Sequence, residues 1–130
     1  MFIDRARVLL VEDDAGLRVG LSALLAQAGY EVRTAWDGVS ALEEIGLSAP
    51  DLIVSELDMP RMSGFDLLWL VSRQLPEIRL IAMSGACSSK KRIRDSVTAD
   101  GFYEKGTHPV FLLQLVNSMT LRETRSRNNA

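Results

Sequence analysis

Acidic residues follow two apolar runs of the sequence. Glu12 and Asp13 come directly after "RVLLV", and Glu56 ends "LIVSE", with Asp58 two residues later. If both runs are neighbouring parallel strands, these carboxylates meet at one edge of a sheet, where ligands usually bind. They repel one another there unless a cation lies among them or some are protonated. A hard, oxygen-seeking ion such as Mg²⁺ suits this set of ligands.

A hydroxyl and a lysine end two further runs. Ser84 closes "LIAMS" and Lys105 closes "GFYEK". The oxygens of a phosphoryl group need hydrogen-bond donors and positive charge, which a serine, a lysine and a bound metal ion supply. The pattern therefore indicates phosphoryl chemistry at the carboxyl ends of the strands.

Short apolar runs alternate with helical patterns along the chain, which is typical of βα units and a parallel sheet. Five strands are predicted, at residues 7–12, 30–35, 52–56, 80–84 and 101–105. Most are continuous apolar runs, as expected of strands covered on both faces, whereas "YEVRTA" alternates and is predicted at an edge.

Apolar residues at helical spacing predict a helix after each of the first three strands. We expect the first helix to end at Gly29 and the second at Gly46, because glycine commonly follows a helix C-terminus. The third helix should begin after Gly64 and end before Pro76.

Two more helices are predicted in the second half of the chain. The fourth runs from residue 88 or 89 to about 98 and offers few apolar residues to the core. The fifth opens with Pro109, a favoured residue of the first turn, and leaves Leu113 and Leu121 outside its apolar stripe. That stripe is expected to consist of Phe111, Leu112, Leu115, Val116 and Met119.

Length and composition favour one soluble domain. The chain has 130 residues, of which 47% are hydrophobic, and a formal charge of −2, so it has material for one core and no large positive field for nucleic acid. We expect a domain at residues 1–125 and a frayed polar tail at 126–130, within a polar stretch that follows Arg122. The apolar N-terminus is too short for a signal peptide or membrane span, and Cys87 has no disulfide partner. These features favour a cytoplasmic protein without membrane contact.

Four segments in order, "VLLVEDD", "PDLIVSELDMPRMSG", "IAMSG" and "GFYEK", resemble the receiver domains of bacterial two-component response regulators over residues 5–122. The resemblance implies a single flavodoxin-like (βα)5 fold, a doubly wound parallel sheet with strand order 2-1-3-4-5. It also implies that Glu12 and Asp13 hold Mg²⁺ together with the backbone carbonyl of Asp58.

The same resemblance assigns roles to residues near the phosphoryl position. Ser84 and Lys105 match the hydroxyl and lysine that contact the phosphoryl group, and Phe102 matches an aromatic residue that reports the switch. The resemblance also implies an output face built from the fourth helix, the last strand and the fifth helix. The surplus Leu113 and Leu121 favour protein contact there, with a histidine kinase, a downstream regulator or a second copy of the chain.

Two departures from the family pattern stand out. The phosphoacceptor, an aspartate in the family, falls on Glu56, whose extra methylene displaces the carboxylate by about 1 Å from the in-line position that phosphoryl transfer needs. Glu56 is therefore expected to be a poor nucleophile and an imperfect, fixed mimic of the phosphorylated state. Gly106 replaces a proline whose peptide bond is typically cis, so we expect a rebuilt loop after Lys105.

Glu56 belongs to the expected metal set as well, with weak binding because its carboxylate enters the space of the ion. A competing arrangement has Lys105 bonded directly to Glu56 without an ion. Simpler interpretations also stand beside the functional ones: the acids near Asp14 could cap the first helix, Lys105 could be a surface lysine, and Phe102 could be plain packing.

Other classes of function remain open. A metal-dependent phosphotransfer or hydrolase enzyme would need a general base, and the single histidine, His108, lies in the loop before the fifth helix. A flavodoxin-like nucleotide or flavin binder would place a phosphate beside "EDDAGL", whose acids repel it. The prediction is a signalling domain, not an enzyme, that acts by protein contact.

Overall fold

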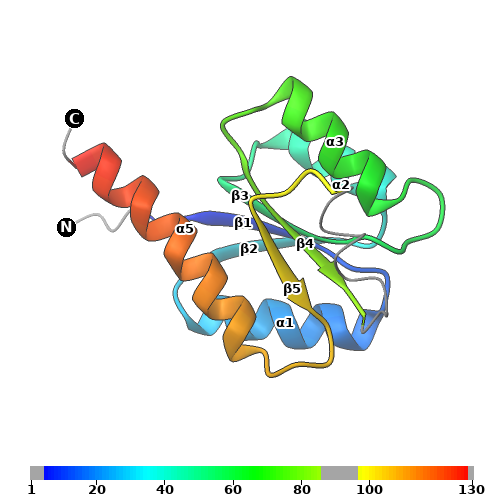
Figure 1. Ribbon diagram of the computed structural model, residues 1–130, viewed down its shortest axis with the longest axis horizontal. Coiled ribbons are helices and arrows are strands. Elements are labelled where there is room, and N and C mark those ends of the chain that lie inside the picture. The colour runs from blue at the N-terminus through cyan, green and yellow to red at the C-terminus, as the bar shows by residue number, and fades with distance from the viewer. Residues whose placement is uncertain (1–4, 86–96, 129–130) are drawn as a thin grey trace.

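A central sheet carries helices on both faces (Figure 1). The computed structural model describes the backbone of residues 5–85 and 97–128, and side chains up to Thr120. The strands are β1 (Arg7–Val11), β2 (Glu31–Ala35), β3 (Leu52–Glu56), β4 (Arg79–Ser84) and β5 (Gly101–Glu104). The helices are α1 (Ala15–Gln27), α2 (Gly38–Leu47), α3 (Gly64–Gln74) and α5 (Val110–Asn128).

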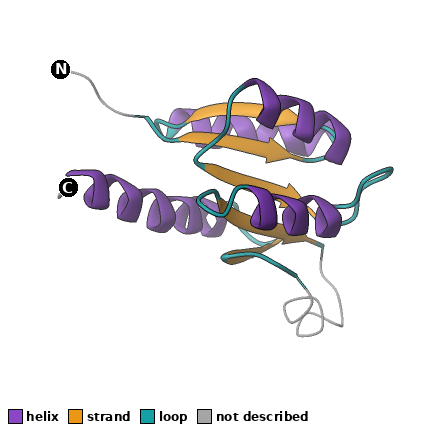
Figure 2. Cartoon of the chain, turned by 90° about the horizontal axis from the view of Figure 1, so that it is seen from above, coloured by secondary structure: helices purple, strands orange, loops and turns teal. Residues whose placement is uncertain are grey.

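All strand pairs are parallel, in the order β2-β1-β3-β4-β5, which confirms the predicted flavodoxin-like sheet. β2, predicted at an edge from its alternating sequence, lies at an edge. Because the strands are parallel, their carboxyl ends share one side of the sheet, and the C-terminal end of α5 lies on the opposite side (Figure 2). The strand order reverses beside β1, and the ends of β1 and β3 are neighbours there.

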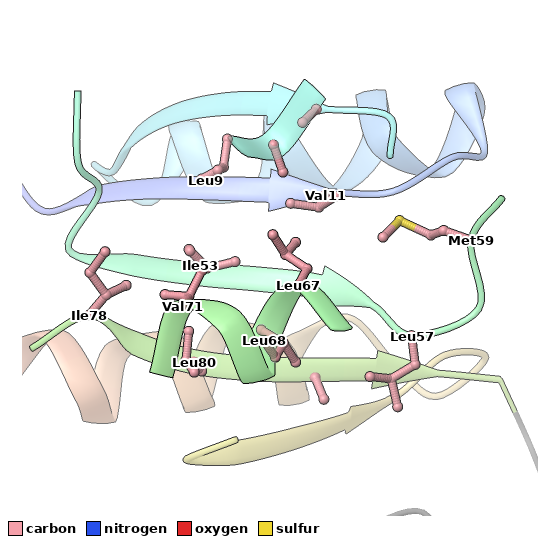
Figure 3. Close-up of a cluster of buried hydrophobic side chains, with 13 residues drawn as sticks. Leu9, Val11, Ile53, Leu57, Met59, Leu67, Leu68, Val71, Ile78 and Leu80 are labelled. Carbon is pink, nitrogen blue, oxygen red and sulfur yellow. The ribbon is translucent and has the colours of Figure 1, made fainter. Parts of the chain in front are cut away.

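The apolar strands supply both cores because successive side chains alternate between faces. Leu9 and Ile53 pack with α2 and α3 on one face, as Figure 3 shows. Leu10 and Val54 pack with α1 and α5 on the other. This explains why β1 and β3 read as continuous apolar runs.

Polar residues begin the helices near the site. Asp14, Asp37 and Ser63 are the N-caps of α1, α2 and α3, and each side chain accepts a backbone N–H of its helix. After α1, Gly29 has a φ of 102°, the left-handed conformation expected at a glycine stop. The expected fourth helix falls largely on residues outside the described part of the chain.

The fifth helix, α5, extends to Asn128, and it corrects two predictions about which of its residues are buried. Phe111, predicted in the core, is 53% exposed, whereas Leu113, predicted outside the buried stripe, is partly buried against the core. The side chain of Leu121 lies outside the described residues. No helix in the described part is long and apolar enough to span a membrane.

Candidate functional site

β1 delivers a buried carboxylate to the carboxyl edge of the sheet. Glu12 follows the last residue of β1, is 0% exposed, and donates its N–H to the Ala35 carbonyl at 3.0 Å. Its Oε2 accepts the Asp14 N–H at 3.2 Å. Arg18, one turn into α1, donates Nη1 to the Glu12 carbonyl at 2.8 Å. Backbone and side chain of Glu12 are thus both fixed.

β3 delivers a second buried carboxylate. Glu56 is 3% exposed, and its Oε1 accepts the Asp58 N–H at 3.0 Å. Gly64, the first residue of α3, lies against the backbone of Glu56: a Cβ there would be 2.0 Å from the Glu56 carbonyl oxygen and 2.7 Å from the Leu57 Cα. Only glycine permits this approach, which holds the start of α3 against the end of β3.

Lys105 joins the two carboxylates. Its Nζ lies 2.7 Å from Glu12 Oε1 and 2.6 Å from Glu56 Oε2. Both oxygens are buried, and in the described part of the chain they have no hydrogen-bond partner beyond this ion pairing. The structure therefore brings together three residues predicted from sequence, in the arrangement that has Lys105 bonded directly to Glu56.

The protonation equilibria reflect this burial. Loss of solvation raises the pKa of Glu12, and its hydrogen bond to Lys105 opposes that change only in part. Burial lowers the pKa of Lys105, but the hydrogen bonds to Glu12 and Glu56 together raise it by more. The net pKa of Lys105 therefore lies above its ordinary value of 10.5. Lys105 is therefore a permanent cation at this site.

The arrangement does not fit a resident Mg²⁺. The four carboxylate oxygens of Glu12 and Glu56 all have partners, two of them the Lys105 ammonium and two of them backbone N–H groups. Asp13 is exposed. Among the side chains that the structure describes, those of residues 5–85 and 97–120, histidine, cysteine and acidic residues form no group of three arranged to hold a metal ion. A divalent ion would have to replace Lys105.

The structure places the other predicted residues around this centre. Ser84 ends β4 and is half-buried, with its carbonyl accepting the Lys105 N–H at 2.7 Å. Phe102 lies in β5, partly buried against the core with α2 and α3. Gly106 has a φ of 93°, in the left-handed region that a proline cannot adopt, and every described peptide bond is trans. The loop after Lys105 is therefore built on glycine geometry.

An ion pair between Arg61, in the β3–α3 loop, and Asp37 was not predicted from sequence. Arg61 Nη1 lies 3.3 Å from Oδ2 of the buried Asp37, although Arg61 holds a strained φ of 65°. Beside it, Met62 fills the space over Gly38, where a Cβ would meet the Met62 Cβ at 2.6 Å. The "DGVS" segment at 37–40 has helix-capping spacing that could have indicated the cap, but no local pattern indicates its ion pair with Arg61.

Exposed apolar side chains lie at the start of α5, next to the end of β5. Phe111 is 53% exposed and Val110 is 39% exposed. Phe111 lines a surface pocket with residues of β5 and α5, namely Phe102, Tyr103, Glu104, Thr107, Gln114, Leu115 and Ser118. The exposed apolar residue on this face is thus Phe111, in place of the predicted Leu113.

Known proteins are similar to this chain in fold and in sequence. The Vibrio cholerae chemotaxis response regulator CheY4 is 31% identical over 88% of this chain and 98% of its own, with a TM-score of 0.80. Response regulator MprA of Mycobacterium avium is 30% identical over 127 residues, 95% of this chain and 54% of MprA. A protein-glutamate methylesterase/protein-glutamine glutaminase of Anaeromyxobacter dehalogenans is 40% identical over 79 residues, 61% of this chain and 22% of that protein.

The chain spans 22% of the methylesterase and 54% of MprA, so the similarity covers only part of these curated relatives. The response regulator receiver domain family matches residues 8–117, which include the strand ends that carry Glu12, Glu56 and Lys105. Domains of this family are in general signalling modules of two-component systems rather than enzymes. With the parallel sheet in the order β2-β1-β3-β4-β5, this match establishes that the chain belongs to the response regulator receiver domain family.

Proposed function

We propose that this chain is an atypical receiver domain of a phosphorelay, not phosphorylated in the normal way, that acts by protein contact. One observation carries the proposal: the residue at the phosphoacceptor position of the family pattern is Glu56, and its carboxylate is bonded to Lys105 at 2.6 Å. In this reading the domain is a pseudo-receiver in the cytoplasm.

The length of Glu56 supports weak acceptor chemistry. A nucleophilic carboxylate must lie in line with the phosphoryl donor, and an error of about 1 Å is costly. The additional methylene of Glu56 carries its carboxylate to the Lys105 ammonium, so the oxygen that would attack is already paired and buried.

A fixed ion pair supports a fixed signalling state. A phosphoryl group carries about two negative charges and three acceptor oxygens, whereas Glu56 offers one charge and two oxygens. Its contact with Lys105 therefore mimics the charged state only in part. Mg²⁺ is proposed as at most a weak ligand of Glu12, Asp13, Glu56 and the Asp58 carbonyl, because it competes with Lys105.

The face around Phe111 is the proposed contact surface. Its exposed apolar side chains suit a protein partner, such as a histidine kinase, a downstream regulator or a second copy of this chain. Leu113, the residue predicted for this surface, packs against the core instead.

Labelling by a small-molecule phosphodonor tests the proposal. Wild-type protein incubated with acetyl phosphate and Mg²⁺ should keep its unmodified mass, because Glu56 is out of line and paired with Lys105. Glu56→Asp withdraws the carboxylate by one methylene and should gain one phosphoryl group, labile to hydroxylamine. Glu56→Gln, which keeps the length and removes the nucleophile, is the matched control.

One outcome would contradict the proposal, and a second would show that the site is altered at more than one point. Phosphorylation of wild type on Glu56 would show an ordinary switch with an unusual acceptor. A folded Glu56→Asp that stays unlabelled would show that the acceptor is not the only altered part, and would direct attention to the Gly106 loop that places Lys105.

A further inference from the structure

The two acids and Lys105 form a cation site that the chain fills by itself. Glu12 is 0% exposed and Glu56 is 3% exposed. Among the described residues, Oε1 of Glu12 and Oε2 of Glu56 have the Lys105 ammonium as their one partner, at 2.7 and 2.6 Å. Two buried negative charges a few ångströms apart require a cation, and the side chain that supplies it comes from β5.

We propose that Lys105 acts as the resident cation of this site and excludes divalent ions, so that the signalling state of the domain does not depend on Mg²⁺. This deepens the proposed function, on which it rests, by assigning the cation of the same site. The sequence predicted a Mg²⁺ site among Glu12, Asp13, Glu56 and the Asp58 carbonyl, with Lys105 bonded directly to Glu56 as the competing arrangement. The geometry points to the second arrangement, as an internal ion triad.

Competition between the two cations favours Lys105. Mg²⁺ requires near-octahedral coordination at about 2.0–2.1 Å and sheds its water reluctantly. The Lys105 ammonium is tethered to the chain, so it occupies the site without loss of translational freedom. The remaining oxygens, Glu12 Oε2 and Glu56 Oε1, are committed to the N–H groups of Asp14 and Asp58.

The extended side chain of Glu56 is central to this exclusion. Its Oε1 remains with the loop N–H of Asp58 while its Oε2 reaches Lys105. A shorter side chain cannot reach both partners from the same backbone position, which is held by the close contact with Gly64. The same methylene that weakens the acceptor therefore also closes the site to metal.

Removal of the internal cation tests the proposal. Lys105→Met keeps a long, unbranched side chain, one atom shorter than lysine, and leaves both buried carboxylates without a counter-ion. In EDTA this variant should unfold at a lower temperature than wild type. Mn²⁺ and Mg²⁺ should restore its melting temperature, and calorimetry should give an affinity at least about tenfold higher than for wild type, a difference of about 1.4 kcal/mol.

Two controls separate the site from general charge effects. Arg7→Met removes the cation of an exposed ion pair with Asp51, 3.7 Å apart at the other end of the sheet, and should bind metal no better than wild type. Lys105→Met/Glu56→Gln removes one of the two carboxylates and should lose most of the gained affinity.

Several results would overturn the proposal. Equal divalent-ion affinity in wild type and Lys105→Met would show that Lys105 does not exclude the ion. A Lys105→Met protein that does not fold in EDTA and is not recovered by Mn²⁺ would show that no ion can take the place of Lys105. Binding of Mg²⁺ by the wild type would count against this proposal alone, and the labelling test of the proposed function would remain valid. Phosphorylation of the wild type would overturn the proposed function without changing these metal affinities.

Discussion

Individual residues around the site are held by hydrogen bonds that also determine their charge. Asp37 accepts the Ser40 N–H at 2.7 Å and faces Arg61 at 3.3 Å. The backbone hydrogen bond from Ser40 lowers the pKa of Asp37 below its ordinary value of 3.8, burial opposes this, and Arg61 lowers it further. Asp37 thus links the start of α2 to the loop that follows Glu56.

The lowered pKa of Asp37 predicts a pH dependence of stability. A carboxyl group whose pKa is lower in the folded than in the unfolded state stabilises the folded protein at pH values above its unfolded-state pKa. This stabilisation is lost as the pH falls below 3.8 toward the folded-state pKa. Asp37→Asn retains helix capping and removes the charge. Denaturant unfolding should show wild type more stable than Asp37→Asn near neutral pH, with a difference that shrinks below pH 3.8. A constant difference across this range would contradict the role of the charge.

Among the elements, α5 differs most from its prediction. The residues that pack on the sheet include Leu112 and Val116, both 0% exposed, with Leu113 partly buried beside them. Tyr30, just before β2, donates its hydroxyl to Asn117 of α5 and lies 2.9 Å from the Thr120 hydroxyl. These contacts fix the rotation of α5 and turn Phe111 outward.

A pair of charge substitutions tests this rotation of α5. Leu113→Glu places a carboxylate against the core and should lower the free energy of unfolding by about 1–3 kcal/mol. Phe111→Glu places it at an exposed position and should change stability by no more than about 0.5 kcal/mol. Chemical denaturation of both variants provides the measurement. The reverse order of effects would mean that α5 packs with the face predicted from its sequence.

For the whole molecule, the carboxyl edge of the sheet and the exposed apolar residues at the start of α5 form two separate surface regions. The ion triad lies at the strand ends, whereas Phe111 and Val110 present apolar surface beside β5. Lys105 directly follows β5, and β5 contributes Tyr103 to the pocket beside Phe111. A receiver whose ion triad is fixed would therefore present this face in one state.

We expect Phe111 to be required for association of the intact protein. Wild type should associate with itself or with a protein partner, and Phe111→Glu, still folded, should lose this association because a charge replaces exposed apolar surface. Sedimentation velocity and co-purification from the native cell measure the two forms of association. Trp69→Glu, at a 52% exposed position on α3, is the matched control. Equal association of wild type and Phe111→Glu would remove this face from the proposal.

The sequence alone determined the elements and the residues at their ends. Continuous apolar runs identified the inner strands because both faces of a parallel sheet are covered. Gly29 marked a helix end because glycine readily adopts the left-handed φ found there, and Pro76 marked another because proline disfavours helical geometry in the residue before it. Glu12, Glu56 and Lys105 could be selected because the strands that precede them are parallel and end on one edge.

Only the tertiary structure decided how those residues meet. A strand pattern does not show whether two carboxylates leave room for an ion or bond directly to a lysine, because that depends on differences of about 1 Å between chain segments far apart in sequence. The ion pair between Arg61 and Asp37 and the rotation of α5 could likewise not be predicted from local sequence patterns. Both depend on contacts between elements, and in α5 apolar residues on more than one side made its sequence compatible with several rotations.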